Sequence, residues 1–165
     1  NVSSNNLTVL PKALWGLTKL KYLNLTANKL KAVPAAISNL KNLQELEIGF
    51  NQLVALPKEI GALSKLNRLS VPKNYLKTLP VETGCLAALQ ISDFSYNQFA
   101  AFPFALTELK DLKTLDFSFN KSLSAYPKEI KEMQSLKLLN LKSTKISTKQ
   151  VEELTWLIPY CQLML

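Results

Sequence analysis

The sequence contains no histidine, and Arg68 is the only arginine among its 20 basic residues. Histidine is the commonest general base and a common metal ligand at neutral pH. Its absence excludes Ser-His and Cys-His catalysis and histidine-bound zinc. Arginine forms bidentate hydrogen bonds with phosphates and guanine edges, whereas lysine is a hydrated point charge found on the surfaces of most soluble proteins. Nucleic acid is therefore a disfavoured partner, although the net charge is +8.

Long apolar runs are missing as well. The longest, from Phe99 to Leu106, spans eight residues and contains Pro103, whereas a transmembrane helix needs about 20 apolar residues. The sequence therefore predicts no transmembrane segment. With 165 residues, 47% hydrophobic and 19% charged, the composition is that of one globular domain.

What the sequence has instead is a repeat of 23 residues. The pattern is L-x-x-L-x-L-x-x-N-x-L-x-x-L-P-x-x-I-x-x-L-x-x, and it extends from residue 1 to about residue 146. Its asparagines are Asn5, Asn28, Asn51, Asn74, Asn97 and Asn120. Its prolines are Pro11, Pro34, Pro57, Pro80, Pro103 and Pro127, the last displaced by one inserted residue. A unit of this size cannot bury its leucines alone, so the units must stack on one another.

Each part of the repeat has a predicted role. The L-x-L segment, with period two, predicts a short strand whose leucines share one face. The asparagine amide has both donors and an acceptor, so these residues are expected to form a structural ladder that satisfies loop backbone groups. The proline ends the extended segment and prepares a short 3₁₀ turn.

The repeats resemble leucine-rich repeats of the 23-residue class. The stretch from Leu56 to Leu66, LPKEIGALSKL, resembles repeats of bacterial proteins, including secreted and surface proteins of spirochaetes, and of intracellular Ras-associated scaffolds. The resemblance implies an α/β fold: a right-handed solenoid, or horseshoe, with a parallel concave sheet and short 3₁₀ or helical convex segments. It also implies a non-enzymatic function in protein binding. It further implies a bacterial protein that is secreted or on the cell surface and interacts with a host. A cytoplasmic location stays open.

We expect one domain, residues 1–165, with about six to seven repeats. Residue 1 aligns with the inside of a strand, so the chain is expected to begin within a repeat. Its first sheet edge would then be unpaired, which predicts either disorder at residues 1–6 or edge-to-edge self-association. Residues 147–165 depart from the repeat and predict a C-terminal capping unit, with a capping box at Ser147 and Gln150, a helix from Thr148 to Leu157 and a closing strand.

The candidate partner-binding residues lie where the repeat faces outward from the sheet. They combine carboxylates, aromatic rings and one arginine, which is typical of a protein-recognition surface. They are Tyr22, Glu45, Glu47, Phe50, Arg68, Asp93, Tyr96, Asp116 and Phe119. Tyr96 and Phe119 are expected to form a continuous aromatic platform, with Phe50 about 10 Å from Tyr96. No catalytic residue, metal site or cofactor is predicted, because an open sheet offers no pocket that would raise the pKa of an acid.

A second set of residues leaves an alternative open. Several lysines come just before the strands, along one edge: Lys19, Lys21, Lys41, Lys65, Lys110, Lys113 and Lys137. They predict weak contact with acidic surfaces. Three hypotheses follow: a protein-binding module, a surface adhesin that contacts anionic glycan or lipid through this edge, and a structural repeat segment of a larger protein. The two cysteines, Cys85 and Cys161, are too far apart along the repeats for a disulfide and are expected to be buried.

Overall fold

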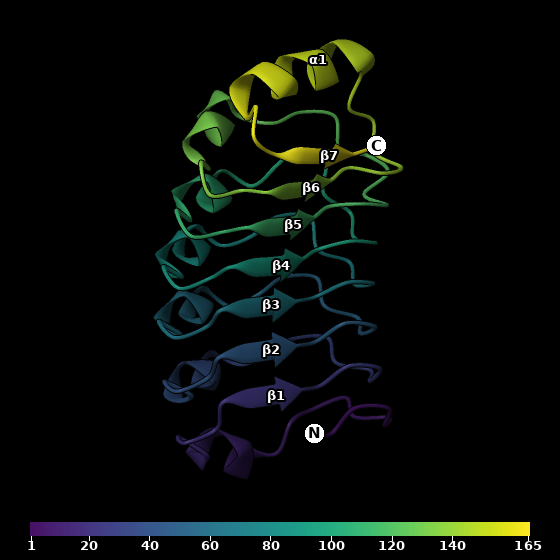
Figure 1. Ribbon diagram of the computed structural model, residues 1–165. Helices are drawn as coiled ribbons and strands as arrows, with labels where there is room; N and C mark the ends of the chain where they lie inside the picture. The colour runs from purple at the N-terminus through teal and green to yellow at the C-terminus, as the bar shows by residue number, and fades with distance from the viewer.

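The computed structural model describes residues 1–165 and shows a solenoid whose coils stack in chain order (Figure 1). Seven parallel strands form one open sheet, each paired with the strand of the next coil. They are β1 (Tyr22–Asn24), β2 (Glu45–Glu47), β3 (Arg68–Ser70), β4 (Ile91–Asp93), β5 (Thr114–Asp116), β6 (Leu138–Asn140) and β7 (Gln162–Met164). Equivalent repeat positions lie side by side, for example Leu46 and Leu69. The predicted parallel sheet is confirmed.

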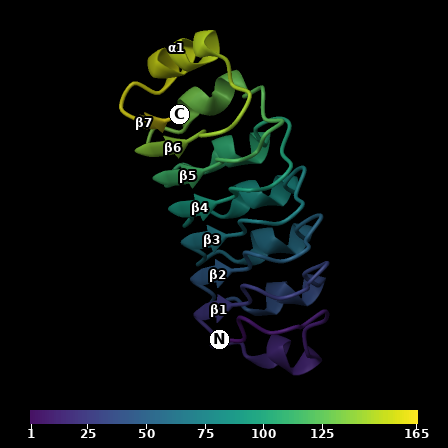
Figure 2. The same cartoon turned by 90° about the vertical axis from the view of Figure 1, so that its right-hand side faces the viewer.

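Six 3₁₀ turns form the side of the solenoid opposite the sheet (Figure 2). They are η1 (Lys12–Gly16), η2 (Ala35–Asn39), η3 (Lys58–Ala62), η4 (Val81–Cys85), η5 (Phe104–Glu108) and η6 (Lys128–Glu132). A repeat proline precedes each turn. Proline has no N–H to leave unpaired, and its carbonyl accepts the first hydrogen bond of the turn, as from Ile60 N to Pro57 O at 3.0 Å.

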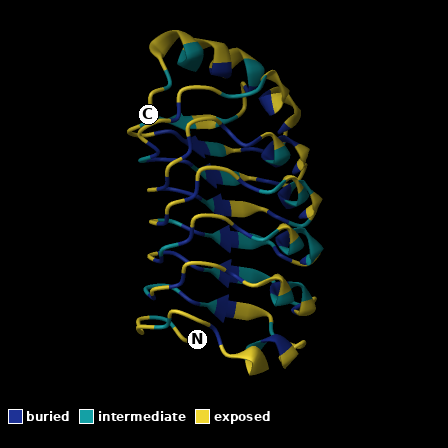
Figure 3. Cartoon of the chain, turned by 180° about the vertical axis from the view of Figure 1, so that it is seen from behind, coloured by how far each residue is buried: buried dark blue, intermediate teal, exposed yellow.

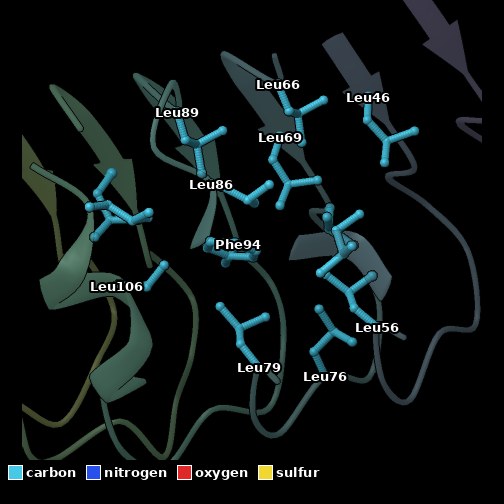
Figure 4. Close-up of a cluster of buried hydrophobic side chains, with 14 of the residues drawn as sticks. Leu46, Leu56, Leu66, Leu69, Leu76, Leu79, Leu86, Leu89, Phe94 and Leu106 are labelled. Carbon is cyan, nitrogen blue, oxygen red and sulfur yellow. The ribbon is translucent and has the colours of Figure 1, made fainter. Parts of the chain in front are cut away.

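The core fills the space between the sheet and the turns. The middle residue of every strand from β1 to β6 is buried, and the exposed residues lie on the outer surfaces of the coils (Figure 3). Leucines from neighbouring coils point toward one another across this space (Figure 4). In the later coils phenylalanines replace leucines; Phe99 and Phe117, for instance, pack edge to face with ring centroids 5.1 Å apart.

Two polar residues stand in this core at positions where the repeat expects Leu or Ile. Ser92 is the middle residue of β4, and Thr83 lies in η4. Both are fully buried, at 1% and 0% exposure, and neither hydroxyl has a hydrogen-bond partner. An unpaired buried hydroxyl costs stability, so this region of the solenoid is less stable than its leucine-filled neighbours.

One glycine is required by the close approach of two 3₁₀ turns. A Cβ at Gly61 would overlap the backbone carbonyl of Glu82 in the next turn. At Gly16, in η1, a Cβ would meet nothing within 4 Å. Close packing between coils therefore requires glycine at position 61 but not at position 16.

The first residues of the chain run alongside β1. Val2 N donates to Asn24 O at 3.0 Å, and Ser4 N donates to Thr26 O at 2.8 Å. Disorder over residues 1–6 is therefore the wrong one of the two alternatives, because residues 2 and 4 extend the hydrogen bonding of the sheet. Edge-to-edge self-association stays a prediction.

The last coil departs from the repeat at helix α1 (Thr148–Leu157). Ser147 and Gln150 form a capping box at its start: Gln150 N donates to Ser147 Oγ, and Ser147 N donates to Gln150 Oε1. Tyr126 Oη donates to Gln150 O at 2.8 Å and joins the helix to the preceding coil. No helix in the structure is both long and apolar enough to cross a membrane.

The two cysteines are free thiols. Cys85 is exposed at the end of η4, so the expectation that both are buried is wrong for Cys85. Cys161 is partly buried, and its burial raises the pKa of the thiol to about 11. Because the thiolate is the reactive form, Cys161 is poorly reactive at neutral pH.

Candidate functional site

The loops that follow the strands are held by the asparagine ladder. Asn74 shows the arrangement: its Oδ1 accepts from Leu53 N at 2.9 Å, and its Nδ2 donates to Ile48 O at 3.0 Å in the preceding coil. Asn28, Asn51, Asn97 and Asn120 make equivalent contacts and are also buried. Asn5 is exposed, and its side chain donates only to carbonyls of its own turn. The ladder fixes the loop positions from coil to coil.

The residue before each ladder asparagine, and before Thr144 at the same position of the last coil, has a left-handed backbone. Its φ lies between 51° and 58° in every coil, and none of these residues is glycine. They are Ser4, Ala27, Phe50, Lys73, Tyr96, Phe119 and Ser143. This conformation costs a non-glycine residue roughly 1 kcal/mol. This conformation could not be predicted from the residue types, because Phe, Tyr and Lys are not typical of left-handed positions.

Four residues of this column form a continuous row, which we call the aromatic ridge: Phe50, Lys73, Tyr96 and Phe119. The rings of Tyr96 and Phe119 stack at 4.1 Å between centroids with an interplanar angle of 8°. Lys73 Nζ lies 4.5 Å from the ring centroid of Phe50 and 5.1 Å from that of Tyr96. The rings of Tyr96 and Phe119 are therefore continuous, as the sequence predicts, and they stack face to face along the solenoid.

The outward residues of β4 and β5 bring two carboxylates together. Asp93 and Asp116 are register partners in adjacent strands, and each accepts from the backbone N–H two residues further on, at 2.9 and 2.8 Å. Burial raises the pKa of Asp93, and the charge of Asp116 adds to that effect. Asn140 Nδ2 donates to Asp116 Oδ2 at 2.9 Å. The two acids thus both hold their own loops and carry uncompensated negative charge at the sheet surface.

A second polar cluster lies on β1 to β3. Glu47 Oε2 accepts from Tyr22 Oη at 2.9 Å and from Asn24 Nδ2 at 2.7 Å. Arg68 Nε lies 3.8 Å from Glu47 Oε1. Glu45 is half-buried beside Tyr22 in the sheet register. This half of the sheet is internally paired, whereas the acids of β4 and β5 are paired only with neutral groups.

The nine predicted partner-binding residues therefore fall into two groups along the solenoid. One group, toward the N-terminal end of the sheet, consists of Tyr22, Glu45, Glu47 and Arg68. The other, on the central strands β4 and β5 and their loops, consists of Asp93, Tyr96, Asp116 and Phe119, with Phe50 joined to it by Lys73. The predicted set leaves out Lys73, which occupies the same repeat position as the three aromatics, and Ile91, an exposed apolar residue of β4. The spacing of 23 residues was the available signal for Lys73.

The surface offers polar and aromatic contacts rather than a reaction centre. No group of three or more acidic or cysteine side chains gathers as a metal ion would require. Hydrogen-bonded carboxylates, ring edges and a lysine can bind a complementary surface.

Comparison with known proteins identifies the repeats. A family model described as a leucine-rich repeat region matches residues 4–77. A leucine-rich-repeat protein of Leptospira interrogans is 32% identical with a TM-score of 0.67, over 98% of this chain and 53% of that chain. A TDR receptor is 30% identical with a TM-score of 0.75, over 93% of this chain and 27% of that chain. The functional domain of InlJ from Listeria monocytogenes is 23% identical with a TM-score of 0.75, over 88% of this chain and 30% of that chain.

No curated protein sequence matches the chain, which spans about half or less of the length of these solved relatives. The Leptospira protein supports the resemblance to bacterial, and specifically spirochaete, repeats. Members of this family typically act as non-enzymatic scaffolds that bind other proteins. By its 23-residue repeats, its parallel sheet with 3₁₀ turns and these relatives, the chain is a leucine-rich-repeat protein.

Proposed function

We propose that the chain binds a protein partner through the outward face of its sheet together with the aromatic ridge. The contact centres on Asp93, Asp116, Tyr96 and Phe119, which lie in adjacent coils. The other predicted contact residues, on β1 to β3, extend the same face.

The main support for this proposal is that large, exposed rings occupy a ridge position that small side chains can also fill. Left-handed positions favour glycine or asparagine, and Ala27 and Ser143 fill the same position with small side chains. The fold therefore does not need a large ring there. Phe50 and Tyr96 are nevertheless aromatic and 49% and 43% exposed. Exposed rings at a position where small side chains suffice are explained by binding, since large aromatic side chains supply much of the energy of protein interfaces.

The charge of the sheet face indicates which partner surface fits. Asp93 and Asp116 have no cationic side chain within salt-bridge distance. A partner that presents a basic group at this point would relieve their mutual repulsion, so the complementary surface is basic opposite β4 and β5.

The lysines before the strands support the glycan or lipid alternative less well. Lys65, Lys110 and Lys113 donate hydrogen bonds to neighbouring groups. The same edge also carries the exposed acids Glu108 and Asp111. An edge of mixed sign attracts an anionic surface weakly.

The test begins with a partner protein that the wild-type chain captures. This partner is purified, and its binding to variants of the chain is then measured. Tyr96→Ala with Phe119→Ala should weaken its binding by more than about tenfold, while the unfolding midpoint in urea changes little. Phe104→Ala is the matched control, because Phe104 is an aromatic residue 55% exposed on the opposite, 3₁₀ side. Equal losses from the two variants, or no loss from the ridge variant, would refute the proposal.

A further inference from the structure

The charge of the protein is concentrated on one edge of the solenoid. We define the loop rim as the loops between each strand and the next proline or capping helix: residues 26–33, 49–56, 72–79, 95–102, 118–126 and 142–146. These loops lie where the chain leaves the strands, at the right of Figure 1. They contain seven lysines and no acidic residue. The opposite edge, just before the strands, has seven lysines together with three acids, Glu108, Asp111 and Glu132.

All seven lysines of the loop rim are exposed. They are Lys29, Lys31, Lys73, Lys77, Lys121, Lys142 and Lys145. None of them lies within salt-bridge distance of a carboxylate. The rim therefore carries +7 of unneutralised charge, close to the net charge of the whole chain, which is +8.

A hollow lies in the middle of the loop rim. Its volume is about 490 Å³, and it is lined by Lys77, Lys121, Gln98, Ser122 and Phe119, with two further residues of the same loops. Two lysines, a glutamine and a serine thus line it beside one ring of the ridge. The ammonium, amide and hydroxyl groups of these residue types donate hydrogen bonds to carboxylates.

The aromatic ridge next to the hollow indicates which class of anionic ligand the rim can bind. Bases of single-stranded nucleic acid stack on exposed aromatic faces, and sugar rings use the same faces. Here Lys73 and Phe119, in the coils on either side, cover the faces of Tyr96. The exposed part of the Tyr96 ring is therefore its edge, which carries partial positive charge and attracts carboxylates. The rim thus combines lysines with an aromatic edge next to the hollow.

We infer that the loop rim binds an extended acidic segment of a polypeptide, with a Glu or Asp side chain in the hollow between Lys77 and Lys121. This inference deepens the proposed function and rests on it, since the partner is a protein. Six coils at about 4.8 Å spacing give a rim of roughly 24 Å, which about eight extended residues can span. The acidic segment of the partner would lie on the rim while its basic surface faces Asp93 and Asp116.

The test uses a fluorescein-labelled 12-residue peptide of repeated Glu-Glu-Leu and follows its anisotropy on titration with the full chain. Lys77→Glu/Lys121→Glu/Lys145→Glu, at rim lysines outside the aromatic ridge, should weaken binding by about tenfold or more at 50 mM salt. The control is Lys19→Glu/Lys41→Glu/Lys65→Glu on the opposite edge, which has the same net charge and should keep binding within about twofold of wild type. Circular dichroism checks that both variants are folded.

Two competitors test the class of ligand. Oligo-dT and a heparin dodecasaccharide, compared at equal charge, should displace the peptide less well than unlabelled peptide does. Absence of peptide binding, equal weakening by the two variants, or tighter binding of either competitor would overturn the inference. None of these results bears on the ridge variants and the purified partner, so the proposed function is tested separately.

Discussion

The ladder asparagine Asn74 is the position at which the stability of the solenoid can be tested most directly. In Asn74→Ala the buried N–H of Leu53 loses its only acceptor, which costs about 1–3 kcal/mol. The amide also loses its donated bonds to Ile48, Val71 and Pro72. Those carbonyls keep other donors, so this second loss adds only about 1 kcal/mol. The expected total is about 2–4 kcal/mol.

The control for this prediction is Asn5→Ala. Asn5 is exposed, and its Nδ2 donates only to Val2 O and Ser3 O, at 3.1 and 2.9 Å. Its replacement should cost less than about 0.5 kcal/mol. Urea unfolding followed by circular dichroism gives both free energies of unfolding. Similar losses at Asn5 and Asn74, or an unchanged stability of Asn74→Ala, would show that the ladder does not hold the coils together.

Three further substitutions test other features of the structure. Gly61→Ala should destabilise the protein by about 1–3 kcal/mol, because the added Cβ would overlap the next 3₁₀ turn. The control Gly16→Ala should be neutral or slightly stabilising. A neutral Gly61→Ala in the same urea assay would contradict the close packing. Burial and the charge of Asp116 raise the pKa of Asp93, so the folded state holds the proton more tightly than the unfolded chain and this carboxyl lowers stability as the pH rises through that pKa. Asp93→Asn should therefore stabilise the protein at pH 7 and lose that advantage near pH 3; urea unfolding at the two pH values measures this, and an advantage that is as large at pH 3 would count against the charge argument. Ser92→Ala removes an unpaired buried hydroxyl, so it should increase the free energy of unfolding by about 1 kcal/mol and raise the melting temperature. A lower melting temperature would mean that the hydroxyl has a partner.

The candidate surface shows which features a repeat alignment can predict and which it cannot. The repeat alignment placed Phe50, Tyr96 and Phe119 in one column and brought Tyr96 next to Phe119. It could not show that the rings meet face to face at 4.1 Å or that Lys73 lies against two of them. Those contacts depend on side-chain rotamers and on the distance between coils, which are properties of the assembled solenoid.

The sequence alone determined the period of 23 residues, the positions of strand, ladder asparagine and proline turn, and the helix that begins after Ser147. These features follow from local preferences and from the need of each unit to bury its leucines against a copy of itself. Only the tertiary structure decided the left-handed backbone before each ladder asparagine, because the loop must close onto the next coil whatever side chain stands there. It also decided that Asp93 and Asp116 lie paired and partly buried. Charge and strain at these positions arise between coils, so no single repeat contains them.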